Sequence, residues 1–272
     1  MAHLSPVTGR YVTIDVMGDE DTVVLVWKDY IAPMNLEEAM SSRYADNALP
    51  RLSSFEAGLD LVRSDASHVT VIGNSYGSHV FGRGLMHAAA DPESQLGIGP
   101  DIAVLVGCPG VDRSVTTAAR ITPAGTKLLV CRADWDYVAY AQQLGHDPAD
   151  FEDAVRFMAS NDEVAIRGHL TYFTRGSEAF EDLCRAGRGD LHLITPAART
   201  TPAQESRLLP GISWAEPMRR LSNGKAAPAL AKAFDGIVAA KWISLSPKNK
   251  PLDADRRRTD GTTTRRPEGP AR

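Results

Sequence analysis

The sequence has few cysteines and no long apolar run. Its 272 residues include only three cysteines, too few and too scattered for a disulfide framework or a zinc cluster. No apolar stretch approaches the roughly 20 residues that a membrane-spanning helix requires. The first ten residues lack the apolar core of a secretion signal. From these absences we expect a cytoplasmic protein in a reducing compartment.

The sequence also lacks a strong charge of one sign and the common cofactor motifs. Its formal net charge of -4 gives no electrostatic reason to expect nucleic acid as the main partner. We find no zinc-protease motif, no clustered cysteines and histidines, no phosphate-binding Walker loop and no glycine-rich dinucleotide motif after a strand. We therefore expect neither a metal nor another cofactor.

Apolar runs that alternate with segments of helical spacing predict an open α/β sheet. Residues 23–27, 69–72, 101–107 and 127–131 are expected strands, and residues 49–62 carry apolar side chains at helical spacing. Strands separated by helices predict parallel βαβ units, whose functional sites lie at the carboxyl ends of the strands. We also expect helices over 35–47, 148–159, 177–186 and 226–242, and strands over 11–17 and 163–167.

The C-terminal part of the chain has a different composition. Beyond about residue 190 the periodicity weakens, and from Ser246 the chain is rich in proline, threonine and arginine. Such a composition cannot bury enough apolar surface to fold. We therefore expect a core over residues 1–190, an extension of uncertain structure over 191–245 and a disordered basic tail over 246–272. A basic arm that contacts an anionic partner is the alternative interpretation of the tail.

Residues 73–77, Gly-Asn-Ser-Tyr-Gly, fit the pattern G-x-S-x-G between a predicted strand and a helical segment. A serine at the apex of a sharp strand-to-helix turn has a strained backbone, and the residues two positions away must be small. Such a turn would lift the Ser75 hydroxyl out of the sheet. It would also place the Tyr76 backbone N–H at a helix start, where it could bind an oxyanion. A loop without chemistry is the alternative.

A serine hydroxyl becomes a nucleophile only with a base and a group that orients that base. In this type of site an acid follows the serine along the chain, and the histidine follows the acid. Asp136, just past the strand at 127–131, is the predicted acid, and Asp134 is its rival. His169, which follows a predicted strand, is the predicted base, and His146 is its rival.

An oxyanion hole needs two N–H donors. Tyr76 would supply one donor. The second is expected from the loop after residues 23–27, where Tyr30 is the best candidate. A plain connection between a strand and a helix is the alternative for this loop.

Several segments together resemble a group of actinobacterial α/β-hydrolases catalogued as a domain of unknown function. These segments are residues 27–33, 71–78, 105–111, 145–148 and 169–173. The resemblance implies an α/β-hydrolase fold, with a mostly parallel central sheet and helices on both faces. It also implies Ser75 as nucleophile, Asp136 as acid and His169 as base. It favours His169 over His146, because in that family the histidine before a Tyr-Phe pair is the one expected to be catalytic.

The expected function is that of a serine esterase acting on a small-molecule ester, with no membrane span and no nucleic-acid partner apart from the alternative for the basic tail. Two features motivate a second hypothesis: the residues beyond about 190 do not resemble the family, and one loop residue departs from it. Asp29 occupies the position before the loop tyrosine where members of the group usually have glycine. The alternative is a non-catalytic binding or scaffold protein with the same fold.

Overall fold

In a computed structural model, the fold is organised around one β-sheet with helices packed against it. The model describes residues 21–34, 36–133, 136, 144–157, 169, 172–197 and 241–247. The strands are β1 (Val23–Val26), β2 (Ser67–Asn74), β3 (Ile102–Val106), β4 (Lys127–Cys131), β5 (Val155–Phe157) and β6 (Lys241–Pro247). The helices are α2 (Leu36–Ala39), α3 (Arg43–Val62), α4 (Tyr76–Ala90) and α7 (Glu178–Arg188). Short 3-10 turns are η1 (Ala118–Ile121), η2 (Pro148–Asp150) and η3 (Leu191–Leu193).

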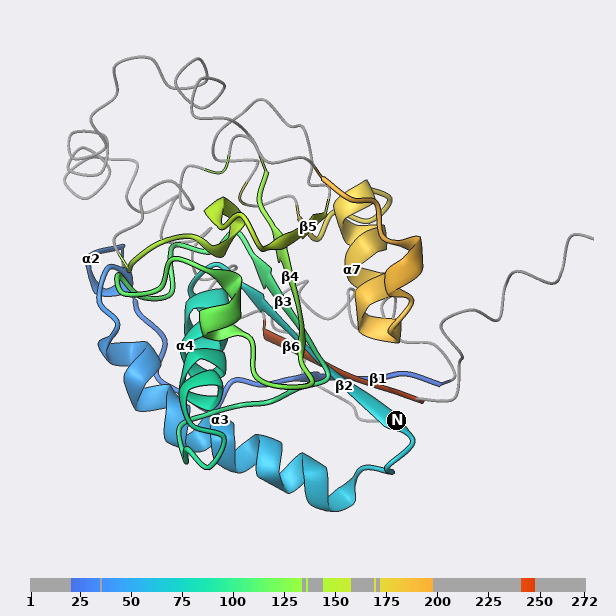
Figure 1. The fold of residues 1–272 in the computed structure, drawn as a ribbon, viewed down its shortest axis with the longest axis horizontal. Coiled ribbons are helices and arrows are strands. Elements are labelled where there is room, and N and C mark those ends of the chain that lie inside the picture. The colour runs from blue at the N-terminus through green and yellow to red at the C-terminus, as the bar shows by residue number, and fades with distance from the viewer. Residues whose placement is uncertain are drawn as a thin grey trace, which may run out of the picture.

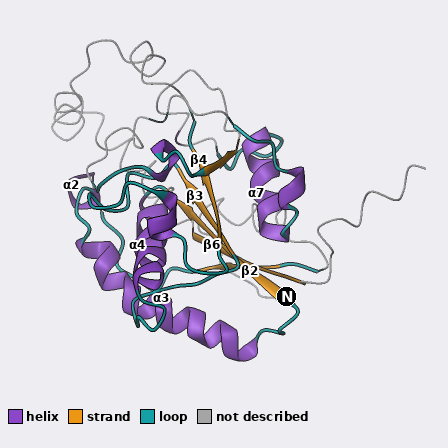
Figure 2. Ribbon diagram, viewed as in Figure 1, coloured by secondary structure: helices purple, strands orange, loops and turns teal. Residues whose placement is uncertain are grey.

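The six strands lie in the order β1-β6-β2-β3-β4-β5. Strands β2 to β5 are parallel neighbours. Strand β6 pairs antiparallel with both β1 and β2, so β1 runs in the same direction as β2. Helices α3 and α4 cover one face of the sheet and α7 covers the other (Figures 1 and 2). This arrangement confirms the predicted α/β class and places the carboxyl ends of β1 to β5 along one edge.

Strand β3 shows why the predicted strands are apolar throughout. Ala103 and Leu105 are buried in a cluster with residues of α3 and α4. Ile102, Val104 and Val106 are buried in a second cluster with residues of α7. Successive side chains of a strand point to opposite faces, so a strand covered on both faces needs apolar residues at every position.

The main predicted strands and the helices over 49–62 and 177–186 are confirmed, and the helix predicted over 35–47 is interrupted. Residues 40–42 separate α2 from α3. The helix predicted over 148–159 is wrong. This segment contains the turn η2 and then strand β5, which pairs with β4. Phe151 is buried on the α4 side of the sheet and Phe157 on the α7 side, so the segment passes around the edge of the sheet.

The helix predicted over 226–242 is wrong at its C-terminal end. Trp242 lies in β6, opposite Val26 of β1 and Ile72 of β2. Aromatic and β-branched residues such as Trp242 and Ile243 suit a strand with a neighbour on each side. The tail predicted to be disordered begins inside this strand, since β6 continues through Pro247. The boundary expected between residues 245 and 246 therefore falls within a paired strand.

Three predicted elements of secondary structure lie wholly or partly outside the described residues: the strands over 11–17 and 163–167, and the part of the last helix before residue 241. Among the helices that are described, none combines the length and the hydropathy of a membrane-spanning segment.

Candidate active site

Ser75 lies at the sharp turn between β2 and α4, with φ 53° and ψ −126°. Non-glycine residues rarely adopt a positive φ, and such strain is often found at functional sites. A Cβ on Gly73 would lie only 2.7 Å from the Ser78 Cα and 2.8 Å from the Gly77 carbonyl oxygen. The close approach of strand and helix therefore requires glycine at position 73, as the sequence pattern predicts.

Hydrogen bonds hold this turn against the neighbouring strand. The Ser75 N–H donates to the Val106 carbonyl at the end of β3 (2.9 Å). The Ser75 carbonyl accepts from the Ser78 N–H (2.9 Å) and from the Ser78 hydroxyl (2.5 Å). Tyr76 is the first residue of α4, so its N–H has no acceptor four residues earlier within the helix. The positive end of the helix dipole is thus directed toward the carboxyl edge of the sheet.

Asp136 and His169 form a buried pair at the same edge. The His169 Nδ1 lies 2.7 Å from Asp136 Oδ1 and 2.8 Å from Oδ2. The side chains of His169 and Asp136 are 2% and 0% exposed, respectively. A hydrogen bond to a carboxylate fixes the orientation of an imidazole, and burial strengthens the interaction because water does not screen it.

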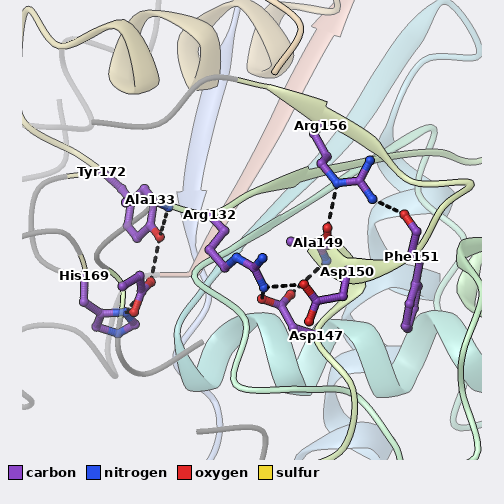
Figure 3. A network of polar contacts seen from close by, with 10 residues as sticks. Arg132, Ala133, Asp147, Ala149, Asp150, Phe151, Arg156, His169 and Tyr172 are labelled. Atoms are coloured by element: carbon purple, nitrogen blue, oxygen red, sulfur yellow. Dashed lines mark hydrogen bonds and ion pairs between the residues drawn. The ribbon is translucent and has the colours of Figure 1, made fainter. Parts of the chain in front are cut away.

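A third buried side chain, Tyr172, completes this cluster and was not singled out as a site residue in the sequence. Its hydroxyl donates to Asp136 Oδ2 (2.6 Å) and accepts from the Ala133 N–H (2.8 Å). In Figure 3 one dashed line joins the Tyr172 hydroxyl to Ala133, and a second joins it to the carboxylate beside His169. Burial and the nearby Asp136 carboxylate raise the pKa of Tyr172 well above its usual range, so the hydroxyl keeps its proton. The signal in the sequence is a tyrosine three residues after the predicted base.

Gly107 links the serine turn to the Asp136–His169 pair. It directly follows Val106, whose carbonyl holds Ser75, and it has a positive φ of 53°. A Cβ at this position would lie 2.6 Å from Asp136 Oδ2 and 3.1 Å from His169 Nδ1. The turn and the pair therefore both lie against the carboxyl end of β3, where only a residue without a side chain leaves room for them.

The structure also distinguishes the rival candidates. His146 is exposed, and its backbone joins two loops through Val111 and Asp112. His79, one turn along α4 from Ser75, is fully buried with its Nδ1 2.8 Å from the Gly110 carbonyl oxygen. Asp134 lies outside the described residues. Of the candidates that can be compared, Asp136 and His169 are the two brought into direct contact.

The loop after β1 is less clearly arranged for an oxyanion. The Tyr30 N–H donates to the Lys28 carbonyl (2.7 Å), within a tight turn of its own loop. The Tyr30 ring stacks on Trp27 with 5.6 Å between centroids, and burial raises the pKa of its hydroxyl. The neighbouring Asp29 forms an exposed ion pair with Arg51. The structure thus places the predicted second donor in a local hydrogen bond.

A separate charged cluster begins one residue before Ala133. The Arg132 Nη1 lies 3.1 Å from Asp147 Oδ2 and 2.8 Å from Asp150 Oδ1 (Figure 3). Asp147 also accepts from the Ala149 N–H (2.9 Å) and so caps η2. Burial raises the pKa of Asp147 to about 7, against the lowering effect of Arg132. Within the described part of the chain, no group of His, Cys, Asp and Glu side chains is arranged to hold a metal ion.

A serine turn at the carboxyl edge of a parallel sheet is the arrangement of α/β-hydrolases. Comparison with protein families decides the assignment, since a model described as alpha/beta hydrolase matches residues 11–146 of this chain. The chain belongs to the alpha/beta hydrolase family. The match includes the serine turn and ends before His169.

This alpha/beta hydrolase is similar to two uncharacterized proteins of Mycobacterium tuberculosis, from strains CDC 1551 / Oshkosh and H37Rv. Each is 29% identical to it over 208 residues. The similar region covers 62% of this chain but only 29% of each relative, so the hydrolase spans less than a third of their length. No solved structure matches it.

Proposed function

We propose that this alpha/beta hydrolase is a serine hydrolase that cleaves carboxylic esters through Ser75, His169 and Asp136. The observation that carries the proposal is the buried Asp136–His169 pair, with Nδ1–Oδ distances of 2.7 and 2.8 Å, against the same strand end that holds Ser75. A histidine oriented by a carboxylate is the base that a serine nucleophile requires.

In the proposed reaction, the Ser75 Oγ attacks the ester carbonyl carbon while His169 Nε2 takes the hydroxyl proton. Asp136 holds the Nδ1–H tautomer and stabilises the imidazolium that forms. Collapse of the tetrahedral intermediate breaks the bond to the alcohol, which leaves with the proton from His169. A water molecule then attacks the acyl-enzyme by the same route, releases the acid and restores Ser75.

The oxyanion of the intermediate would be stabilised mainly by the Tyr76 N–H at the start of α4. We propose the Tyr30 N–H as the second donor. It would have to leave its hydrogen bond with the Lys28 carbonyl when substrate binds. If the Tyr30 N–H became free only when substrate bound, substrate binding itself would complete the oxyanion hole.

Hydrolysis of p-nitrophenyl esters of graded acyl length tests this function and measures the preferred chain length. Ser75→Ala should lower kcat/KM by at least about 1,000-fold for every ester cleaved. Ser54→Ala is a matched control and should leave the rate unchanged, because Ser54 is exposed on α3 and its hydroxyl donates to the Pro50 carbonyl. Full activity of Ser75→Ala would disprove the assignment.

A second candidate function is that of a non-catalytic binding or scaffold protein. It is favoured by the occupied Tyr30 N–H and by Asp29 beside it, which places a carboxylate in the loop proposed to stabilise an anion. This candidate predicts that the wild-type protein hydrolyses none of the esters and leaves a fluorophosphonate probe unreacted.

We further infer that the chain belongs to the actinobacterial group of α/β-hydrolases that its motifs resemble. Its similarity to two mycobacterial proteins supports this inference. A small-molecule ester remains the proposed substrate class, and a cytoplasmic location remains a prediction. Residues 248–272 lie outside the described residues, so a disordered tail remains a prediction only beyond β6, over 248–272, and so does its alternative role as a basic arm. Loss of anion binding on deletion of these residues would support the basic arm.

A further inference from the structure

Tyr172 makes two hydrogen bonds that give its hydroxyl proton a defined direction. The Ala133 N–H points at the hydroxyl oxygen from 2.8 Å, so that the oxygen acts there as an acceptor. The hydroxyl proton is then directed to Asp136 Oδ2 at 2.6 Å. The ring is fully buried and lies edge-on to the His169 ring, with 6.3 Å between centroids. These contacts leave the Tyr172 side chain little freedom to rotate.

The contact between Asp136 and His169 does not by itself fix the rotation of the carboxylate. Both of its oxygens lie within hydrogen-bond distance of His169 Nδ1, at 2.7 and 2.8 Å, so the imidazole alone does not select one of them. Tyr172 contacts only Oδ2. A donor on one oxygen fixes the rotation of the carboxylate and keeps Oδ1 directed to the imidazole.

On the basis of the proposed function, we propose that Tyr172 is a positioning residue, which orients the Asp136 carboxylate toward His169 and takes up part of its charge. Tyr172 would not touch the substrate. It would act through Asp136, in the way that Asp136 acts through His169.

Other titratable groups lie near this carboxylate. Among the described residues, the buried thiols of Cys131 and Cys108 interact electrostatically with Asp136. The Cys131 thiol also interacts with the Asp182 and Asp147 carboxyls. Burial raises the pKa of Cys131 and that of Cys108 far above neutrality, so both thiols are uncharged. His169 and Tyr172 both contact the Asp136 carboxylate directly through their side chains.

Tyr172→Phe removes the hydroxyl and keeps the ring. We expect kcat/KM to fall about 10- to 100-fold, the loss that follows when a catalytic group is slightly misplaced. The midpoint of the acidic limb of the pH profile should rise by about 0.5 pH unit or more, because the full carboxylate charge then stabilises the protonated imidazole. Tyr44→Phe, which removes a hydroxyl on α3 that accepts from the Arg43 side chain, is the control and should change neither value.

A double-mutant cycle separates positioning from a general structural role. In an Asp136→Asn background, Tyr172→Phe should lower the remaining rate by less than about twofold, because the two side chains act as one unit. Equal losses in both backgrounds, or an unchanged pH profile, would overturn the proposal.

A measurement independent of turnover keeps this test separate from that of the proposed function. The proton between His169 and Asp136 should give a low-field ¹H NMR signal that is absent from Asp136→Asn and displaced in Tyr172→Phe. An identical signal in wild type and Tyr172→Phe would contradict the role of Tyr172. If Ser75→Ala retained activity, the proposed function would fail, while this comparison would still decide whether Tyr172 orients Asp136.

Discussion

Two buried polar clusters begin at adjacent residues after β4, and they differ in what they can do chemically. Arg132 binds Asp147 and Asp150 in a cluster built around one permanent cation. The other cluster begins at Ala133, whose N–H donates to the Tyr172 hydroxyl. That hydroxyl in turn donates to Asp136, which contacts His169. Arginine does not release its proton in proteins, whereas an imidazole gains and loses one near neutral pH.

The comparison shows that a buried charge with a shifted pKa is not by itself a catalytic sign. Asp147 has a pKa of about 7, which would suit a general base, yet its carboxylate is engaged by Arg132 and by the start of η2. Asp136 instead contacts a side chain that can carry a proton to and from a substrate. We therefore expect the Arg132 cluster to control stability and the His169 cluster to control activity.

The largest expected effect is on activity, from His169→Ala. This substitution removes the proposed base, and kcat/KM for ester hydrolysis should fall by at least about 1,000-fold. The free energy of unfolding should fall less than in Arg132→Met, because the Tyr172 hydroxyl still donates to the Asp136 carboxylate. A variant that kept its activity, or that lost activity only because it unfolded, would remove the distinction between the two clusters.

The next effect is on stability, from Arg132→Met. The side chains of Arg132 and Asp147 are 5% and 2% exposed, so the variant leaves a buried carboxylate without its cation. Urea unfolding should show a loss of about 3–5 kcal/mol. The control is Arg51→Met, whose ion pair with Asp29 is exposed and should contribute at most about 1 kcal/mol. Equal losses from the two variants would contradict the structural role of the Arg132 cluster.

Gly107→Ala should lower activity by an intermediate amount. Its Cβ would lie 2.6 Å from Asp136 Oδ2, and displacement of the carboxylate should reduce kcat/KM about 10- to 100-fold. Gly125→Ala is a matched control, because Gly125 also has a positive φ, of 87°, but no atom within 4 Å of the added Cβ. Both variants carry backbone strain of about 1–3 kcal/mol. A similar fall in activity in both would show that strain, and not the contact with Asp136, is responsible.

The last prediction concerns the pH dependence of stability that Asp147 confers. Burial, opposed by Arg132, raises its pKa in the folded protein from 3.8 to about 7. Between these values the folded protein binds a proton that the unfolded chain releases, so this carboxyl contributes stability at low pH that is lost as the pH rises to about 7. The free energy of unfolding of the wild type minus that of Asp147→Asn should therefore decrease from pH 4 to 7. A difference that stayed constant or increased would contradict this.

The sequence predicted the parts of the fold that depend on local pattern. The serine turn requires glycine at position 73 because a Cβ there would collide with the α4 backbone, and the G-x-S-x-G pattern predicts this requirement. The predicted apolar strands correspond to β2, β3 and β4. Strand β6 was missed because it is defined by pairing with β1 and β2, which are far from it in the chain. Strand β5 was missed because Phe151 and Val155 have helical spacing, while the chain here passes around the sheet edge.

The candidate site was predicted only where chain order restricts the choice. The order of serine, acid and histidine left Asp134 and His146 as rivals, and the family resemblance favoured His169; the structure brings Asp136 and His169 into contact. Tyr172 and Gly107 were not identified, since their roles arise from contacts made in the folded protein. The exact partner of the Tyr30 N–H depends on the conformation of one loop, which no spacing rule specifies.

The central claim is that Ser75 is a nucleophile activated by the buried Asp136–His169 pair. Its most direct test is to treat the folded protein with a fluorophosphonate probe and to locate the adduct by mass spectrometry. We predict one adduct, on Ser75, that forms at least about 100-fold more slowly in His169→Ala. Absence of labelling, an adduct on another serine, or equal rates in the wild type and His169→Ala would contradict the claim.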